Sequence, residues 1–106
     1  MSYRFMRMLV MFDLPTETTE QKREYRRFRK VLIQNGFSML QESVYTRLIL
    51  TPSVEIITLS ALKKEKPKGG RVTALMVTEK QFAGMEYIVG EYHSETLDTD
   101  ERVVVF

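Results

Sequence analysis

The chain has 106 residues, of which 43% are hydrophobic and 28% charged, and its formal net charge is +2. These values are typical of a single globular domain, and they exclude a disordered or fibrous chain and a second catalytic domain. The chain has no cysteine and one histidine, His93, which excludes disulfides, thiolate nucleophiles and zinc sites rich in cysteine or histidine. Any metal should therefore be an oxygen-bound ion such as Mg²⁺ or Mn²⁺.

A short apolar segment, FMRMLVMF at residues 5–12, predicts a central strand that ends at Asp13. Two interpretations of Asp13 stay open. Either the carboxylate begins a turn that Pro15 helps to fix, or it lies at the end of a rigid strand where it can face a metal ion or a substrate.

The next segment has the pattern of an amphipathic helix over residues 19–34. Thr18 and Gln21 have the spacing of a capping box, and Asn35-Gly36 is typical of a helix end. The apolar positions expected to pack on the sheet are Tyr25, Phe28, Val31, Leu32 and Ile33. The remaining faces should be basic.

Residues 37–50, FSMLQESVYTRLIL, predict a hairpin with strands near 37–41 and 44–50, because aromatic and β-branched residues surround a polar centre. Thr51 and Pro52 then have the pattern of a helix start. The apolar stripe of that second helix should comprise Val54, Ile57, Ala61 and Leu62. The helix should end in KKEKPKGG, residues 63–70, which has the composition of an exposed basic loop.

Residues 71–78, RVTALMVT, predict a fourth strand, which completes the order strand, helix, strand, strand, helix, strand. This order is typical of a ferredoxin-like α+β fold, a two-layer sandwich of helices on one face of an antiparallel sheet. We assign residues 1–80 to this domain and residues 81–106 to an acidic C-terminal extension with short strands at 85–90 and 102–106. Because one sheet face would lack cover, we expect a homodimer, and the extra strands should extend a sheet edge.

Charge is distributed unevenly along the chain. Residues 1–85 carry 15 Lys and Arg against 8 Asp and Glu, whereas residues 86–106 carry one Arg against six acids. A basic body is typical of a polyanion binder, although ordinary solvated charge is the alternative. The candidate phosphate-binding residues are Arg23, Arg26, Arg27, Lys30, Lys63, Lys64, Lys66 and Lys68. No run of about 20 apolar residues and no signal peptide is present, so we expect a cytoplasmic location without membrane contact.

Three features occur together: Phe12-Asp13 at the end of the first strand, an arginine-rich first helix, and QESVYTRL at residues 41–48 leading into the third strand. Together they resemble the CRISPR-associated endoribonuclease family, the second of the two core CRISPR adaptation proteins, in the branch that accompanies type II effector systems. The resemblance covers nearly the whole chain. It implies a ferredoxin-like homodimer that binds the duplex of a new spacer between two dimers of the CRISPR-associated integrase.

The resemblance further implies that Asp13 is a catalytic magnesium ligand and that two such aspartates face each other across the dimer. Such an ion could activate water for phosphodiester cleavage of RNA or DNA. No general base is identifiable near Asp13 in the sequence, which favours a scaffold role over efficient catalysis. A ferredoxin-like regulatory module that binds a small ligand is the alternative function, although the chain has no glycine-rich phosphate loop apart from Gly69-Gly70.

Three other residues have two interpretations each. Phe37 and Tyr45 could stack on a base, but aromatic residues in strands more often belong to the core. Ser43 could bind a phosphate oxygen, but serine in a hairpin turn usually bonds the backbone.

Overall fold

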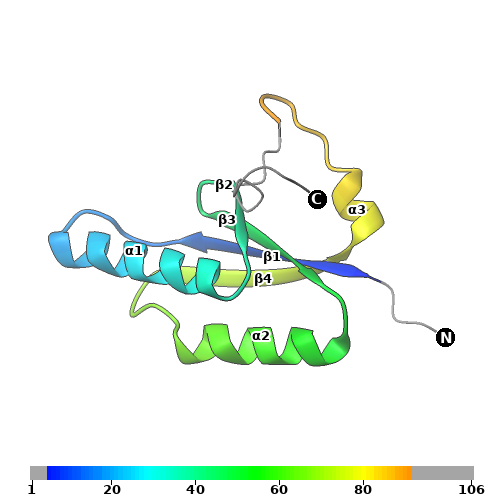
Figure 1. Ribbon diagram of the computed structural model, residues 1–106. Helices are drawn as coiled ribbons and strands as arrows, with labels where there is room; N and C mark the ends of the chain where they lie inside the picture. The colour runs from blue at the N-terminus through cyan, green and yellow to red at the C-terminus, as the bar shows by residue number, and fades with distance from the viewer. Residues whose placement is uncertain (1–4, 92–106) are drawn as a thin grey trace, which may run out of the picture.

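The computed structural model describes residues 5–91, which form four strands and three helices (Figure 1). In chain order they are β1 (Met6–Asp13), α1 (Thr19–Gln34), β2 (Ser38–Gln41), β3 (Val44–Ile49), α2 (Pro52–Lys64), β4 (Arg71–Thr78) and α3 (Glu79–Ala83). The strands and the first two helices begin and end close to the residues predicted from sequence. The predicted basic loop at 63–70 is shorter than expected, because α2 continues through Lys64.

The four strands form one sheet in the order β2-β3-β1-β4. All three neighbouring pairs are antiparallel. The β1 strand is central, with Leu9 opposite Thr46 of β3 and Leu75 of β4. This topology confirms the ferredoxin-like α+β fold, since α1 and α2 each connect two strands that are separated by a third strand.

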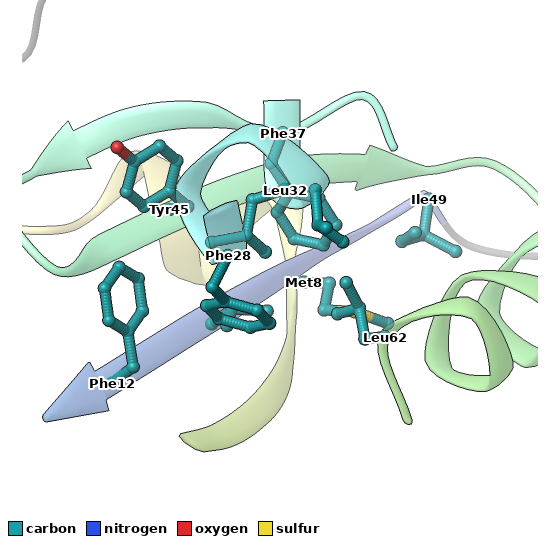
Figure 2. Close-up of a cluster of buried hydrophobic side chains, with 10 residues drawn as sticks. Met8, Phe12, Phe28, Leu32, Phe37, Tyr45, Ile49 and Leu62 are labelled. Atoms are coloured by element: carbon teal, nitrogen blue, oxygen red, sulfur yellow. The ribbon is translucent and has the colours of Figure 1, made fainter. Parts of the chain in front are cut away.

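The hydrophobic core lies between one face of the sheet and helices α1 and α2 (Figure 2). Alternate residues of β1 point into it, because successive side chains of a strand face opposite sides. The buried residues of this core are Met8, Val10, Phe12, Phe28, Val31, Leu32, Phe37, Tyr45, Ile49 and Leu62. The odd-numbered residues of β1, Asp13 included, therefore face the other side of the sheet.

Both long helices begin as predicted. The Thr18 hydroxyl accepts the backbone N–H of Gln21, and the Gln21 side chain accepts the Thr18 backbone N–H, which completes the capping box. The Thr51 hydroxyl accepts the Val54 N–H, with Pro52 at the first helical position. Satisfying these otherwise orphan amides fixes where each helix starts.

Two apolar residues predicted to face the core are exposed instead. Ile33 is 49% exposed and Ile57 is 67% exposed. Ile33 lies next to the buried Leu32, and Ile57 lies next to the buried Thr58. Adjacent residues of a helix point about 100° apart around its axis, so both isoleucines point away from the core. In α2 the buried position belongs to Thr58, whose hydroxyl accepts a hydrogen bond of 2.9 Å from Arg47 Nη1. The prediction failed there because a polar residue occupies the buried line of the helix.

The segment after β4 also differs from the prediction. A capping box of Thr78 and Gln81 starts the short helix α3, which the sequence analysis missed. Residues 85–90 form no strand in the described chain. A strand requires a hydrogen-bonded neighbour, and residues 5–91 offer this segment none. The second predicted strand, at 102–106, and His93 lie outside the described residues.

Helix α3 lies across the sheet from α2 (Figure 1). The Arg7 side chain, on the β1 face opposite the core, bonds both carboxylate oxygens of Glu79 at 2.8 and 2.6 Å. Its guanidinium also lies 4.3 Å from the centre of the Phe82 ring. The remaining sheet face is partly apolar and exposed, with Leu75 at 50% and Leu48 at 38%. Within residues 5–91, no helix has the length and apolar character needed to cross a bilayer.

Candidate functional site

Asp13 is the last residue of β1 and its side chain is exposed. It lies opposite Arg71, the first residue of β4, in the β1–β4 register. Directly opposed residues in a sheet share a face, so Asp13 and the exposed Arg71 both belong to the face without α1 and α2. Arg71 was not among the site residues predicted from sequence, because strand register, which brings the two residues together, has no local sequence signal.

The backbone before Asp13 is held by the hairpin turn. The Phe12 N–H donates a hydrogen bond of 3.0 Å to the Ser43 carbonyl. Ser43 adopts a left-handed conformation with φ of 67°, and its hydroxyl lies 3.2 Å from the Tyr25 hydroxyl. The Ser43 hydroxyl therefore contacts a side chain of α1 and not the backbone, which a turn serine was expected to bond.

An aromatic cluster anchors Phe12, the neighbour of Asp13, at the end of β1 (Figure 2). Its ring lies 5.6 Å from the Tyr25 ring, 5.4 Å from Phe28 and 5.8 Å from Tyr45, measured between centroids. Tyr45 and Phe37 are both buried, so neither ring is available to stack on a base. The Tyr45 hydroxyl accepts a hydrogen bond of 2.6 Å from Arg29 Nε. The core interpretation of both aromatic residues is therefore confirmed.

Gly70 fits closely against the other side of Asp13. Its φ is +82°, and a Cβ at this position would lie 2.6 Å from the Asp13 carbonyl oxygen and 2.7 Å from Leu14 Cδ2. Only glycine adopts this conformation and allows this approach without strain. The backbone around Asp13 is thus fixed by β3, by β4 and by the segment that precedes β4.

A single chain supplies few ligands for a metal at Asp13. Within residues 5–91 no group of three or more acidic, histidine or cysteine side chains lies close enough to hold an ion. Magnesium requires near-octahedral oxygen coordination. One carboxylate supplies only one or two of these oxygens, so the remaining ligands of a magnesium ion at Asp13 would have to come from water, from a substrate or from another chain.

The candidate phosphate-binding residues occupy two neighbouring parts of the fold. The first set lies on the exposed side of α1, opposite Phe28, and comprises Arg23, Arg26 and Lys30. The second set lies at the end of α2 and in the loop to β4, and comprises Lys63, Lys64, Lys66 and Lys68. We call these seven exposed residues the basic surface. Among residues 5–91, none of their cationic groups forms an ion pair.

The two sets meet at a groove of about 470 Å³ beside the start of α1. Arg23 from α1 and Lys68 from the loop both line it. A second groove of about 500 Å³, between α2 and β4, is lined by Lys63, Lys66 and Lys68 above an apolar floor. The fold therefore brings together cations from segments about 40 residues apart in the sequence.

Arg27, the eighth candidate, is placed differently. Its guanidinium bonds both carboxylate oxygens of Glu24, at 3.2 Å through Nε and 2.9 Å through Nη2. It also contacts Glu65 Oε1 at 3.3 Å. The hydrogen bond from Arg27 lowers the pKa of Glu24, and the same bond raises the pKa of Arg27, so both groups are ionised at neutral pH. Arg27 therefore connects α1 to the residue that follows α2.

Comparison with known proteins shows the family. Residues 6–85 match the model of the family described as "CRISPR associated protein Cas2". A protein of Treponema denticola named "CRISPR-associated endoribonuclease Cas2" is 49% identical over 100 residues, which cover 94% of this chain and 99% of that protein. A protein of the same name from Streptococcus mutans is 48% identical over 99 residues, which cover 93% of this chain and 91% of that protein.

A solved structure described as "Crystal structure of cas2" superposes with a TM-score of 0.59, covering 95% of this chain and 99% of that one. Its sequence identity is 17%, so this likeness supports the fold alone. The family match over most of the described residues, together with relatives of nearly the same length, carries the assignment. The chain belongs to the CRISPR-associated Cas2 family and has a CRISPR-associated role.

Proposed function

We propose that this chain is a dimeric subunit of CRISPR spacer acquisition that binds duplex DNA and bridges dimers of the CRISPR-associated integrase in the cytoplasm. The observation that carries the proposal is the basic surface. Its seven side chains are exposed, and within residues 5–91 none of them forms an ion pair. Membership of the Cas2 family favours this function over a regulatory module that binds a small ligand.

The chemistry of the basic surface suits phosphates. Lys and Arg on a helix face and an adjoining loop contact phosphate oxygens without reading base edges. Duplex binding should therefore be insensitive to sequence and should weaken as salt rises. In a plot of the logarithm of affinity against the logarithm of salt concentration, each phosphate neutralised should contribute about 0.9 to the slope. A dimer would double the number of such contacts.

The face of the sheet without α1 and α2 supports dimerisation. It exposes Leu48 and Leu75 and also carries Asp13. An exposed apolar face of this kind is typical of a surface that another protein covers. A symmetric contact would bring this face of one copy against the same face of the other, and residues close to the two-fold axis would meet their own counterparts. The two Asp13 carboxylates could then share one Mg²⁺ or Mn²⁺ ion.

A metal-dependent phosphodiesterase activity on RNA or DNA forms the second part of the proposal. When bound, such an ion polarises a phosphoryl oxygen or lowers the pKa of a bound water. The chain itself would contribute the Asp13 carboxylate, a rigid β1 end and the nearby positive charge of Arg71. The relatives from Treponema denticola and Streptococcus mutans are named endoribonucleases, which supports this part.

Sedimentation and duplex binding test the proposal together. At micromolar concentration the chain should sediment as a dimer and should bind duplexes of unrelated sequence with the same affinity. The logarithm of that affinity should fall linearly with the logarithm of the salt concentration. A stable monomer would contradict the dimer, and duplex binding that does not respond to salt would contradict the role of the basic surface.

A further inference from the structure

One charged pair lies at the junction between α1 and the loop that precedes β4. Arg27 and Glu24 are one turn apart on α1 and bond through a two-pronged contact. Such a fork holds the guanidinium plane in one orientation. The same two side chains also bond residues 65–68, which lie about 40 positions later in the chain.

Four contacts connect this pair to the loop. Arg27 Nη2 donates to the backbone carbonyls of Glu65 at 3.0 Å and Lys66 at 3.3 Å. Arg27 Nη1 donates to Glu65 Oε1 at 3.3 Å. Glu24 Oε2 accepts the backbone N–H of Lys68 at 3.2 Å. The pair therefore holds the backbone on both sides of Pro67, which itself has a fixed φ.

These contacts leave the loop lysines exposed while fixing the chain that carries them. The bonds use backbone groups of Lys66 and Lys68, and the ammonium groups stay available. Lys68 and Arg23 consequently line the same groove from opposite elements. By composition the loop after α2, EKPKGG at residues 65–70, has little apolar surface with which to hold itself in place.

We propose that Glu24 and Arg27 are positioning residues for duplex binding and that Arg27 is not itself a phosphate contact. The pair holds the loop lysines, Lys66 and Lys68, beside the three exposed cations of α1, Arg23, Arg26 and Lys30. This inference rests on the proposed duplex binding. A loop that is ordered before binding does not lose that freedom on binding, so preorganisation raises affinity without adding a contact. An acidic residue would then strengthen binding to a polyanion.

The sign of the effect at Glu24 separates positioning from simple electrostatics. Glu24→Ala makes the chain more positive, so electrostatics alone predicts tighter duplex binding. Positioning predicts weaker binding, with the dissociation constant rising about threefold to tenfold at fixed salt because the loop must be ordered on binding. The matched control is Glu20→Ala, which removes the same charge from an exposed position one turn earlier on α1 and beside the same groove. Glu20 forms no ion pair within residues 5–91, so its removal should leave affinity unchanged or slightly improved.

The salt slope of Arg27→Ala tests the second half of the inference. A positioning residue should weaken binding while the slope stays the same, because the number of phosphates neutralised does not change. A loss of about 0.9 units of slope per subunit would show that Arg27 contacts a phosphate and would overturn the assignment.

Hydrogen exchange of the Lys68 amide gives a readout that does not depend on DNA. This amide should be protected in the parent chain and in Glu20→Ala and should exchange faster in Glu24→Ala, with the amides of β4 unaffected. If the parent binds duplex DNA and Glu24→Ala binds as tightly or more tightly, the positioning inference is overturned. If the parent does not bind duplex DNA, the proposed function itself fails, whatever the amide shows.

Discussion

The Asp13 end of the sheet and the basic surface differ in how their proposed chemistry is distributed. At the end of β1 one carboxylate stands on a backbone fixed by Ser43 and Gly70. The basic surface spreads its charge over seven exposed side chains from two segments. Substitution of Asp13 should therefore abolish the proposed cleavage in a single step. Substitutions in the basic surface should each lower duplex affinity by a small and nearly equal amount.

The difference also shows what each region requires of the fold. Phosphate contacts tolerate displacement of a long, flexible lysine, because a charge near the duplex acts at a distance. A carboxylate that shares a metal ion must be placed far more accurately. Accordingly, the backbone near Asp13 carries close packing and a left-handed serine, whereas the lysines need only a loop held by one charged pair.

Asp13→Ala should have the largest effect. If the proposed metal site is correct, metal-dependent cleavage should fall by at least about 100-fold, because the carboxylate proposed as the metal ligand is lost. Duplex affinity and its salt slope should change little, since Asp13 lies outside the basic surface. Cleavage of a labelled duplex and of a labelled RNA by purified parent and variant measures this effect. Cleavage at the parent rate would show that the activity originates elsewhere.

The triple variant Arg23→Ala, Arg26→Ala and Lys30→Ala should have the opposite profile. Its salt slope for duplex binding should flatten by about two to three units per subunit engaged, because three phosphate contacts are removed. Spacer acquisition should be impaired although Asp13 is intact. Binding measured across a salt series decides the matter, and an unchanged slope would leave the exposed side of α1 without a role in DNA binding.

The sequence predicted the elements that have strong local signals. The capping residues Thr18 and Thr51 fixed two helix starts, and the charge of the basic surface was visible in the composition. Long-range geometry was not accessible in this way. The pairing of Arg71 with Asp13 depends on strand register, and the bonds of Arg27 to Glu65 depend on how α1 packs beside the loop.

Two local predictions failed for separate physical reasons. Ile57 was assigned to the core on hydrophobicity, whereas Thr58 takes the buried position because Arg47 satisfies its hydroxyl. Residues 85–90 have the composition of a strand but no partner strand within residues 5–91. The hydrophobic pattern thus predicts which residues favour burial or strand pairing, and the neighbouring residues in the fold decide whether they are buried or paired.

Gly70→Ala tests the rigidity of the Asp13 region. It should lower the free energy of unfolding by about 1–3 kcal/mol, because alanine disfavours a φ of +82° and its Cβ would collide with the Asp13 carbonyl. Gly69→Ala is the matched control, since a Cβ at Gly69 meets no atom within 4 Å. Thermal or denaturant unfolding of both variants gives the difference. Equal stability of the two would mean that the backbone near Asp13 yields easily, which would weaken the contrast with the basic surface.

Glu79→Gln should have the smallest effect and should leave both regions unchanged, since α3 contacts the start of β1, at the end opposite to Asp13. The hydrogen bond from Arg7 lowers the pKa of Glu79 in the folded chain. The ion pair therefore stabilises the fold above pH 4.3, about the value for a glutamate in an unfolded chain, and the stabilisation is lost as pH falls through the lower folded pKa. Because the Glu79 side chain is 40% exposed, solvent screening limits the contribution to under about 1 kcal/mol.

Unfolding free energies of parent and variant should thus differ by a constant amount near neutral pH and converge below about pH 4.3. A difference that persists unchanged at pH 3, or a loss of duplex binding at neutral pH, would show that α3 acts through something other than this ion pair.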